Sequence, residues 1–183
     1  MIPPSREWSW QGPIVDHHIH LDKSGQGIEA AKAFKASGGT SILLVHKPDF
    51  SSLPTDGEGY RAAYSSTLEM ADYVRKKIDI DVGVILGPHP VAWDHQVDEM
   101  GIQAASEIHL EAVSIALEHV DERDAVGPGE VGRPHYAVSE ERWGYANDLL
   151  LDVLKMAKED DSAVQLHVEE NAEETCRSID EIR

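Results

Sequence analysis

The sequence predicts an α/β fold of parallel strands, in the form of a (β/α)8 TIM barrel of which about five βα units are present. Short apolar runs alternate with longer helical patterns along the 183 residues, which is the order of parallel strands joined by helical crossovers. Polar residues also follow every predicted strand at its carboxyl end: His20, His46, His89, Glu130 and His167. A barrel directs groups from several strands to one rim, whereas an open sheet usually concentrates its site at one switch point.

The first two units are recognisable from their hydrophobic patterns. A predicted strand over residues 14–20 precedes a predicted helix over 29–36, which ends at a pair of glycines. Residues 40–45 are nearly all apolar, as in parallel strands that are buried on both faces. A loop then leads to a predicted helix over 60–78.

The remaining units repeat this alternation. The predicted strands cover residues 81–86, 125–131 and 162–168, and the predicted helices cover residues 102–120, 140–160 and 173–183. The predicted strand over residues 125–131 is rich in glycine, which allows another group to approach the backbone closely.

The length limits how much of a barrel is present. An eight-stranded barrel typically needs about 250 residues, and the sequence reaches only the start of its fifth predicted helix. We therefore expect residues 1–183 to form a single domain that is incomplete at its C-terminal end. The 41% of apolar residues is enough for a hydrophobic core.

The composition excludes several classes of function. The formal net charge is −18, from 34 acidic and 16 basic residues, so an extended nucleic-acid-binding surface is not expected. A single cysteine, Cys176, excludes an internal disulfide and a cysteine-rich zinc site. We find no signal peptide and no apolar run that could span a membrane, and we expect a cytoplasmic protein.

Residues 16–22 read DHHIHLD and form the densest group of metal-binding side chains. Side chains alternate between the two faces of a strand, so Asp16, His18 and His20 share one face and His17 points to the other, toward the helices. Two imidazoles two residues apart can bind one ion. Asp16 would then accept the ring N–H of a liganding histidine and fix its tautomer.

Two more clusters can complete a metal site. Glu130 lies between glycines at the end of its strand, and strand parity places Gln165, His167 and Glu169 on one face. Histidine and carboxylate ligands suit zinc, manganese, iron or magnesium, and a shared carboxylate can hold two cations about 3.5–4 Å apart. We expect one or two divalent cations, of zinc, magnesium or manganese, that activate a water for hydrolysis.

Four elements occur in a recognisable order: DHHIHLD at residues 16–22, Gly-Pro-His-Pro at 87–90, Gly-Glu-Val-Gly at 129–132, and His167. In this order they resemble the TatD-like metal-dependent hydrolases of the amidohydrolase superfamily. The resemblance extends over the whole chain and agrees with the barrel fold that the hydrophobic pattern predicts.

The resemblance implies a role for each matching residue. The pair matching the first-strand ligands, His18 and His20, would bind one metal ion, and Glu130 would bridge to a second ion bound by His167. His89 would contact the substrate or the leaving group, so Glu130 and His89 are the expected catalytic residues. The implied reaction is phosphodiester hydrolysis, above all of DNA ends, or the related cleavage of small-molecule esters or amides.

The sequence departs from the family pattern at two places. The family completes its site with a histidine on the sixth strand and an aspartate on the eighth, and these strands lie beyond the five units present. Arg133-Pro134-His135-Tyr136 also replaces the Leu-Asp that commonly follows the Gly-Glu-x-Gly element. The substrate preference therefore stays open.

The other polar residues near the rim are harder to assign. Asp16, His46 and Glu169 are expected to support the metal ligands or contact substrate, although His46 is equally compatible with a structural role. His95 and His135 lie in predicted rim loops, and a structural or solvent-exposed role is favoured for both. His109 and His119 are expected on the solvent-exposed side of a long acidic helix.

Other classes of protein are also compatible with the sequence. A PHP-type phosphoesterase also begins with His-x-His, and other enzymes of the amidohydrolase superfamily cleave esters or amides. A non-catalytic metal-binding or interaction fragment is a further alternative. Its open edges at the first and fifth strands would need a partner chain. The oligomeric state is not predicted.

Overall fold

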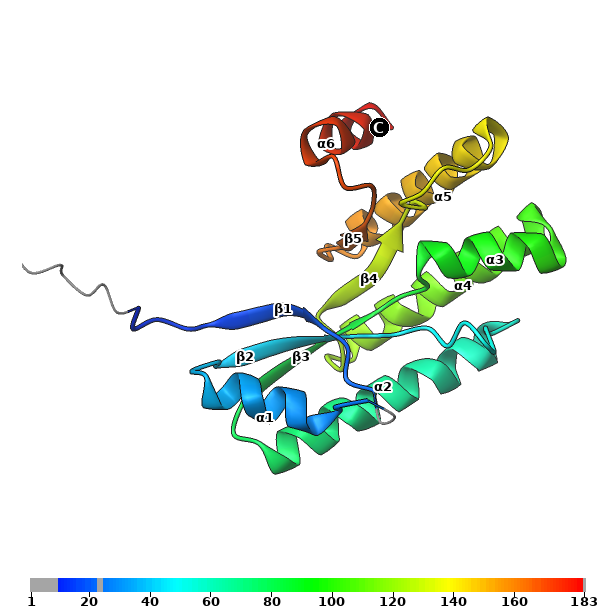
Figure 1. Ribbon diagram of the computed structural model, residues 1–183. Coiled ribbons are helices and arrows are strands. Elements are labelled where there is room, and N and C mark those ends of the chain that lie inside the picture. Colours follow the sequence, from blue (N-terminus) through cyan, green and yellow to red (C-terminus); the bar gives the residue numbers. More distant parts are fainter. Residues whose placement is uncertain (1–9, 23–24, 183) are drawn as a thin grey trace, which may run out of the picture.

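A computed structural model describes residues 10–22 and 25–182. Five parallel strands lie side by side in the order of the chain (Figure 1). The strands are β1 (Val15–Ile19), β2 (Ser41–Val45), β3 (Asp81–Leu86), β4 (Gly127–Gly132) and β5 (Gln165–His167). Because the strands are parallel, their carboxyl ends meet at one rim.

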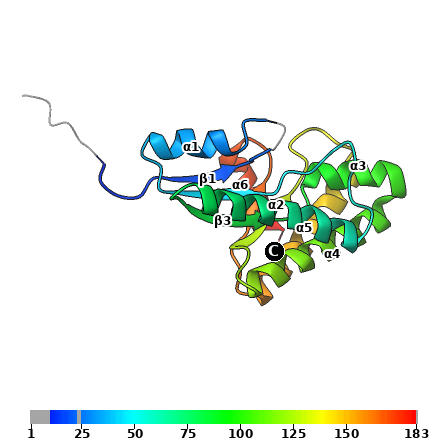
Figure 2. The same cartoon turned by 90° about the horizontal axis from the view of Figure 1, so that it is seen from below.

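Helices connect the successive strands, and the last helix follows β5. They are α1 (Ile28–Ala36), α2 (Gly57–Lys77), α3 (Pro90–Met100), α4 (Ile102–Asp121), α5 (Glu140–Glu159) and α6 (Ala172–Glu181). The side chain of Asp56 accepts a hydrogen bond from the backbone N–H of Gly59 and caps α2. Seen from below, α2 and α4 lie in front of the strands and cover the outer face of the sheet (Figure 2).

The sheet is curled rather than open. The side chain of Gln165 on β5 donates a hydrogen bond of 2.9 Å to the backbone carbonyl of His17 on β1. The first and last strands therefore approach each other across the inner face, which confirms the prediction of a partial (β/α)8 barrel.

The main hydrophobic core lies between the sheet and the helices α2 and α4. Fully buried strand residues such as Ile42 and Val84 pack with Tyr64 and Val74 of α2 and with Ala116 of α4. This burial fixes the outer layer of helices against the strands.

Two predictions about the helices are wrong. The sequence pattern predicts no helix over residues 90–100, but α3 occupies them and begins with Pro90 at its first position. His109 was expected at the solvent, but its side chain is buried and only 1% exposed. The reason is that α4 packs against α3 on one side and against α5 on the other, so it has little solvent-exposed surface near His109.

The predicted strand boundaries differ slightly from the structure. β5 covers only residues 165–167, whereas the sequence predicts 162–168.

No helix within the described residues combines the length and the apolar character that crossing a membrane requires.

Candidate metal centre

Side chains from three strands meet at the carboxyl rim of the sheet. His18 comes from β1, His20 follows it, Glu130 comes from β4 and His167 from β5. A glycine at position 132 makes this approach possible, because a Cβ atom there would collide with the carbonyl oxygen of His167. The glycines around Glu130 thus bring β4 and β5 close together.

The first group of possible ligands consists of His18, His20 and Glu130. The Nε2 atoms of His18 and His20 lie 3.2 Å apart, and Oε2 of Glu130 lies 3.7 Å and 3.5 Å from them. For metal–nitrogen bonds of about 2.0–2.1 Å, two ligand atoms on a tetrahedral ion lie roughly 3.3–3.4 Å apart. The spacing of the three atoms therefore fits the ligands of one cation.

The orientation of His20 also suits a metal ligand. Its Nδ1 atom lies 2.9 Å from the backbone carbonyl oxygen of Val45, so Nδ1 carries the proton and Nε2 presents its lone pair to the group. The hydrogen bond to Glu130 raises the pKa of His20, against the effect of burial. When no ion is bound, the ring can carry a second proton on Nε2, and it then donates to Val45 on one side and to Glu130 on the other.

The expected role of Asp16 is corrected by this contact. We expected Asp16 to accept the ring N–H of a liganding histidine, but Val45 supplies the acceptor for His20. The Oδ1 atom of Asp16 instead accepts the backbone N–H of His18 at 3.1 Å. The pairing of β1 with β2 is irregular between Asp16 and Ile19, and this local bend lets the aspartate turn back on its own strand.

The second group of possible ligands is formed by His89, Glu130 and His167. Here Oε1 of Glu130 lies 2.7 Å from Nδ1 of His167 and 3.9 Å from Nε2 of His89. Glu130 thus directs one oxygen toward each group, as a bridging carboxylate does. Burial opposes its ionisation, but the hydrogen bonds from His167 and His20 outweigh burial and hold the pKa of Glu130 well below its usual range.

His89 differs from the other histidines of the cluster. It is the N-cap of α3, and its Nδ1 accepts the backbone N–H of Val91 at 3.1 Å. Burial lowers the pKa of His89 to about 4, so the ring is neutral and its proton lies on Nε2, which faces Glu130. His89 is therefore a hydrogen-bond donor to the site, and its Nε2 is not free to bind a metal ion.

His46 follows β2 directly and contacts α2. Its Nδ1 bonds to the hydroxyl of Thr67 on α2 at 2.8 Å, and its ring packs against Tyr64. Burial lowers the pKa of His46 to about 4. The sequence left two roles open for His46, contact with the site and a structural role. These contacts with α2 support the structural role.

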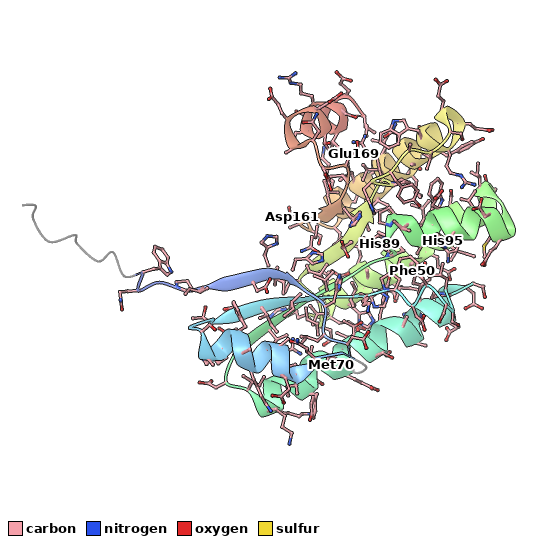
Figure 3. The ribbon with its side chains drawn as sticks, in the orientation of Figure 1. Phe50, Met70, His89, His95, Asp161 and Glu169 are labelled. Atoms are coloured by element: carbon pink, nitrogen blue, oxygen red, sulfur yellow. The ribbon has the colours of Figure 1, made fainter. Side chains whose placement is uncertain are left out.

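Glu169 does not lie in the cluster as strand parity suggested. β5 ends at His167, so the alternation no longer applies two residues later. Glu169 instead accepts two hydrogen bonds from the fully buried Arg133, of 3.1 Å from Nε and 2.6 Å from Nη2. In Figure 3 it lies beside α6, apart from His89.

One residue of the cluster was expected to have a structural or solvent-exposed role. His135, from the loop after β4, has its Nδ1 2.8 Å from Nε2 of His167. The remaining histidines lie elsewhere. His17 is exposed on β1, His119 lies near Glu122 and Asp124 at the end of α4, and His95 is exposed on α3 beside Phe50.

A pocket of about 950 Å³ adjoins the cluster. It lies between α2 and the loop that follows β2, and His89 forms part of its wall. Phe50 from this loop has its ring centre 6.0 Å from that of His89, and the two residues lie together with His95 in Figure 3. A group leaving the metal centre on the side of His89 would enter this pocket.

Fold and site together define a partial α/β barrel with a histidine and glutamate centre at the carboxyl ends of its strands, the usual position of barrel active sites. A comparison with protein families matches residues 15–183 to the family described as TatD related DNase. The chain belongs to this family, as the order of its motifs indicated.

Individual relatives agree with this assignment. An uncharacterized protein of Methanocaldococcus jannaschii is 33% identical over 173 residues, which make up 93% of this chain and 60% of that protein. The solved TatD-like protein of Archaeoglobus fulgidus has a TM-score of 0.55 at 17% identity, over 92% of this chain and 62% of that one.

A solved uncharacterized amidohydrolase of Saccharomyces cerevisiae shares the fold with a TM-score of 0.58 at 13% identity, over 93% of this chain and 51% of that one. The chain therefore spans between 51% and 62% of the length of these three proteins.

Proposed function

We propose that this protein is a divalent-metal-dependent hydrolase of the TatD kind that cleaves phosphodiester bonds with a metal-activated water. The observation that carries the proposal is the position of Glu130. Its two carboxylate oxygens face two separate histidine groups, His18 with His20 and His167 with His89. His18, His20, Glu130 and His167 provide the donor atoms of a two-metal centre with a shared carboxylate, and His89 lies beside them.

The residues of the site would have two separate functions, metal binding and proton donation. His18, His20 and Glu130 would hold one ion, and Glu130 and His167 would hold the other. Such ions lower the pKa of a bound water and polarise a phosphoryl oxygen. His89 would donate its Nε2 proton toward the oxygen of the leaving group, while its Nδ1 stays fixed by the N-terminus of α3.

The walls of the pocket favour a short substrate. Lys47 is paired with Asp22 at 2.9 Å, and Asp49 and Asp56 add further negative charge. A long polyanion would gain little there, because affinity for nucleic acid rests on many cationic contacts to phosphates. We therefore infer that the substrate is a small phosphodiester or the end of a nucleic-acid strand.

The test uses the purified protein, stripped of metal and then reconstituted with Mn²⁺, Zn²⁺ or Mg²⁺. We expect hydrolysis of bis(p-nitrophenyl) phosphate and release of nucleotides from strand ends only after reconstitution. His20→Asn should remove this activity, and His95→Asn should retain it. Equal activity with and without metal, or hydrolysis of an ester or an amide but of no phosphodiester, would contradict the proposal.

A further inference from the structure

His135 is a histidine of the rim that has no role in the proposed function. Its Nδ1 atom lies 2.8 Å from Nε2 of His167, whose own Nδ1 is 2.7 Å from Glu130. The three side chains therefore form a continuous chain of hydrogen bonds that ends at the carboxylate shared by both ligand groups. The carboxylate only accepts, so the metal-free chain runs from His135 through His167 to Glu130.

The loop that carries His135 is anchored on both sides of this residue. Before it, the backbone N–H of Arg133 bonds to the carbonyl oxygen of His167 at 3.1 Å. The buried guanidinium of Arg133 also bonds to Glu169, Asn147 and Ser178. These contacts hold the start of the loop against β5 and the two flanking helices.

The residue after His135 is anchored independently. The hydroxyl of Tyr136 donates a hydrogen bond of 2.5 Å to the buried Asp94 on α3. His135 is thus held between two fixed neighbours, although its own ring is exposed. Its contact with His167 follows from this placement and does not depend on burial of the ring.

We propose that His135 is a positioning residue that orients the imidazole of His167 and thereby strengthens the second cation site. An imidazole Nδ1 can donate or accept, so the contact persists when His167 releases Nδ1 to an ion and carries its proton on Nε2. Hydrogen-bond partners of this kind fix the ring of a metal-binding histidine, and their loss typically costs about 10–100-fold in metal affinity. The inference rests on the metal centre of the proposed function.

The test measures metal binding rather than activity. Titration calorimetry with Mn²⁺ on wild type should resolve two sites, and His135→Ala should weaken one of them by about 10–100-fold while the other stays unchanged. His135→Asn places a polar atom near the position of Nδ1 and should recover most of the affinity. His95→Ala, which removes another exposed histidine of the rim, is the matched control.

The outcomes separate this inference from the proposed function. Wild type that binds no Mn²⁺ contradicts the metal centre itself. Two sites in wild type with unchanged affinities in His135→Ala overturn the role of His135 alone. An equal loss at both sites, or a loss that His135→Asn does not recover, also overturns it, because either result would indicate general damage or direct ligation.

Discussion

Glu130 and His167 lie on neighbouring strands, with Oε1 of the carboxylate 2.7 Å from Nδ1 of the imidazole. The other oxygen of Glu130 lies 3.5 Å from Nε2 of His20, which extends the contact to the first strand. One side chain therefore connects the two ends of the curled sheet.

The first prediction concerns the proton of His89. His89→Asn can still cap α3, because asparagine is a favourable N-cap residue, but it lacks a donor at the position of Nε2. For a phosphodiester with an alkyl leaving group, we expect kcat/KM to fall by about 100-fold or more. For a p-nitrophenyl leaving group, which departs without a proton, the fall should be much smaller.

Metal binding provides the control for this variant. The affinity of His89→Asn for Mn²⁺ should stay within about twofold of wild type, since Nε2 of His89 carries a proton and binds no ion. An equal loss of activity with both leaving groups, or the loss of one ion, would show that His89 acts as a ligand.

The second prediction concerns the buried Arg133. Lysine keeps the charge but cannot form the two parallel bonds to Glu169 or reach Asn147 and Ser178 at the same time. Arg133→Lys should therefore lower the free energy of unfolding by about 2–4 kcal/mol in urea denaturation. Arg177→Lys on the exposed surface of α6 should change it by less than about 0.5 kcal/mol. Similar effects at the two positions would contradict a structural role for Arg133.

The third prediction concerns the pH dependence of stability. Burial lowers the pKa of His109 to about 3, from an ordinary value of 6.5. Between these values the unfolded chain binds a proton at His109 and the folded protein does not. The free energy of unfolding of the metal-free protein should therefore decrease as the pH falls below 6.5, by about 1.4 kcal/mol per pH unit for each such histidine.

Replacing His109 with leucine removes one of these contributions. We expect His109→Leu to show a smaller slope of unfolding free energy against pH between pH 6.5 and 4.5, measured by urea denaturation. His46 and His89 would still contribute, because burial lowers the pKa of each to about 4. His95→Gln, at an exposed position, should leave the slope unchanged, and an unchanged slope in His109→Leu would contradict the prediction.

Much of the candidate site could be predicted from the sequence, because parallel strands place their carboxyl ends at one rim. From this rule the sequence predicts that four residues lie at the same rim, and the structure brings all four together: His18, His20, Glu130 and His167. The parity of a strand, by contrast, holds only as far as the strand extends. Glu169 lies beyond the end of β5 and is oriented by Arg133 instead.

Other features depend on tertiary contacts that a local pattern does not contain. The surroundings of His109 depend on α3, a helix that the sequence did not predict because its pattern of polar and apolar residues is weak. His135 lies in a loop whose course is set by Arg133 and by the bond between Tyr136 and Asp94. Its contact with His167 therefore could not be inferred from spacing.

Anomalous diffraction from crystals soaked in Mn²⁺ or Zn²⁺ will show whether Glu130 joins two cation sites. We predict two peaks about 3.5–4 Å apart on either side of the Glu130 carboxylate, one beside His18 and His20 and the other beside His167. Both peaks should weaken or vanish in Glu130→Gln, while Glu99→Gln on the exposed surface of α3 should retain them. A wild-type protein without a peak at Glu130, or a Glu130→Gln variant that keeps both peaks, would show that Glu130 does not join two cation sites.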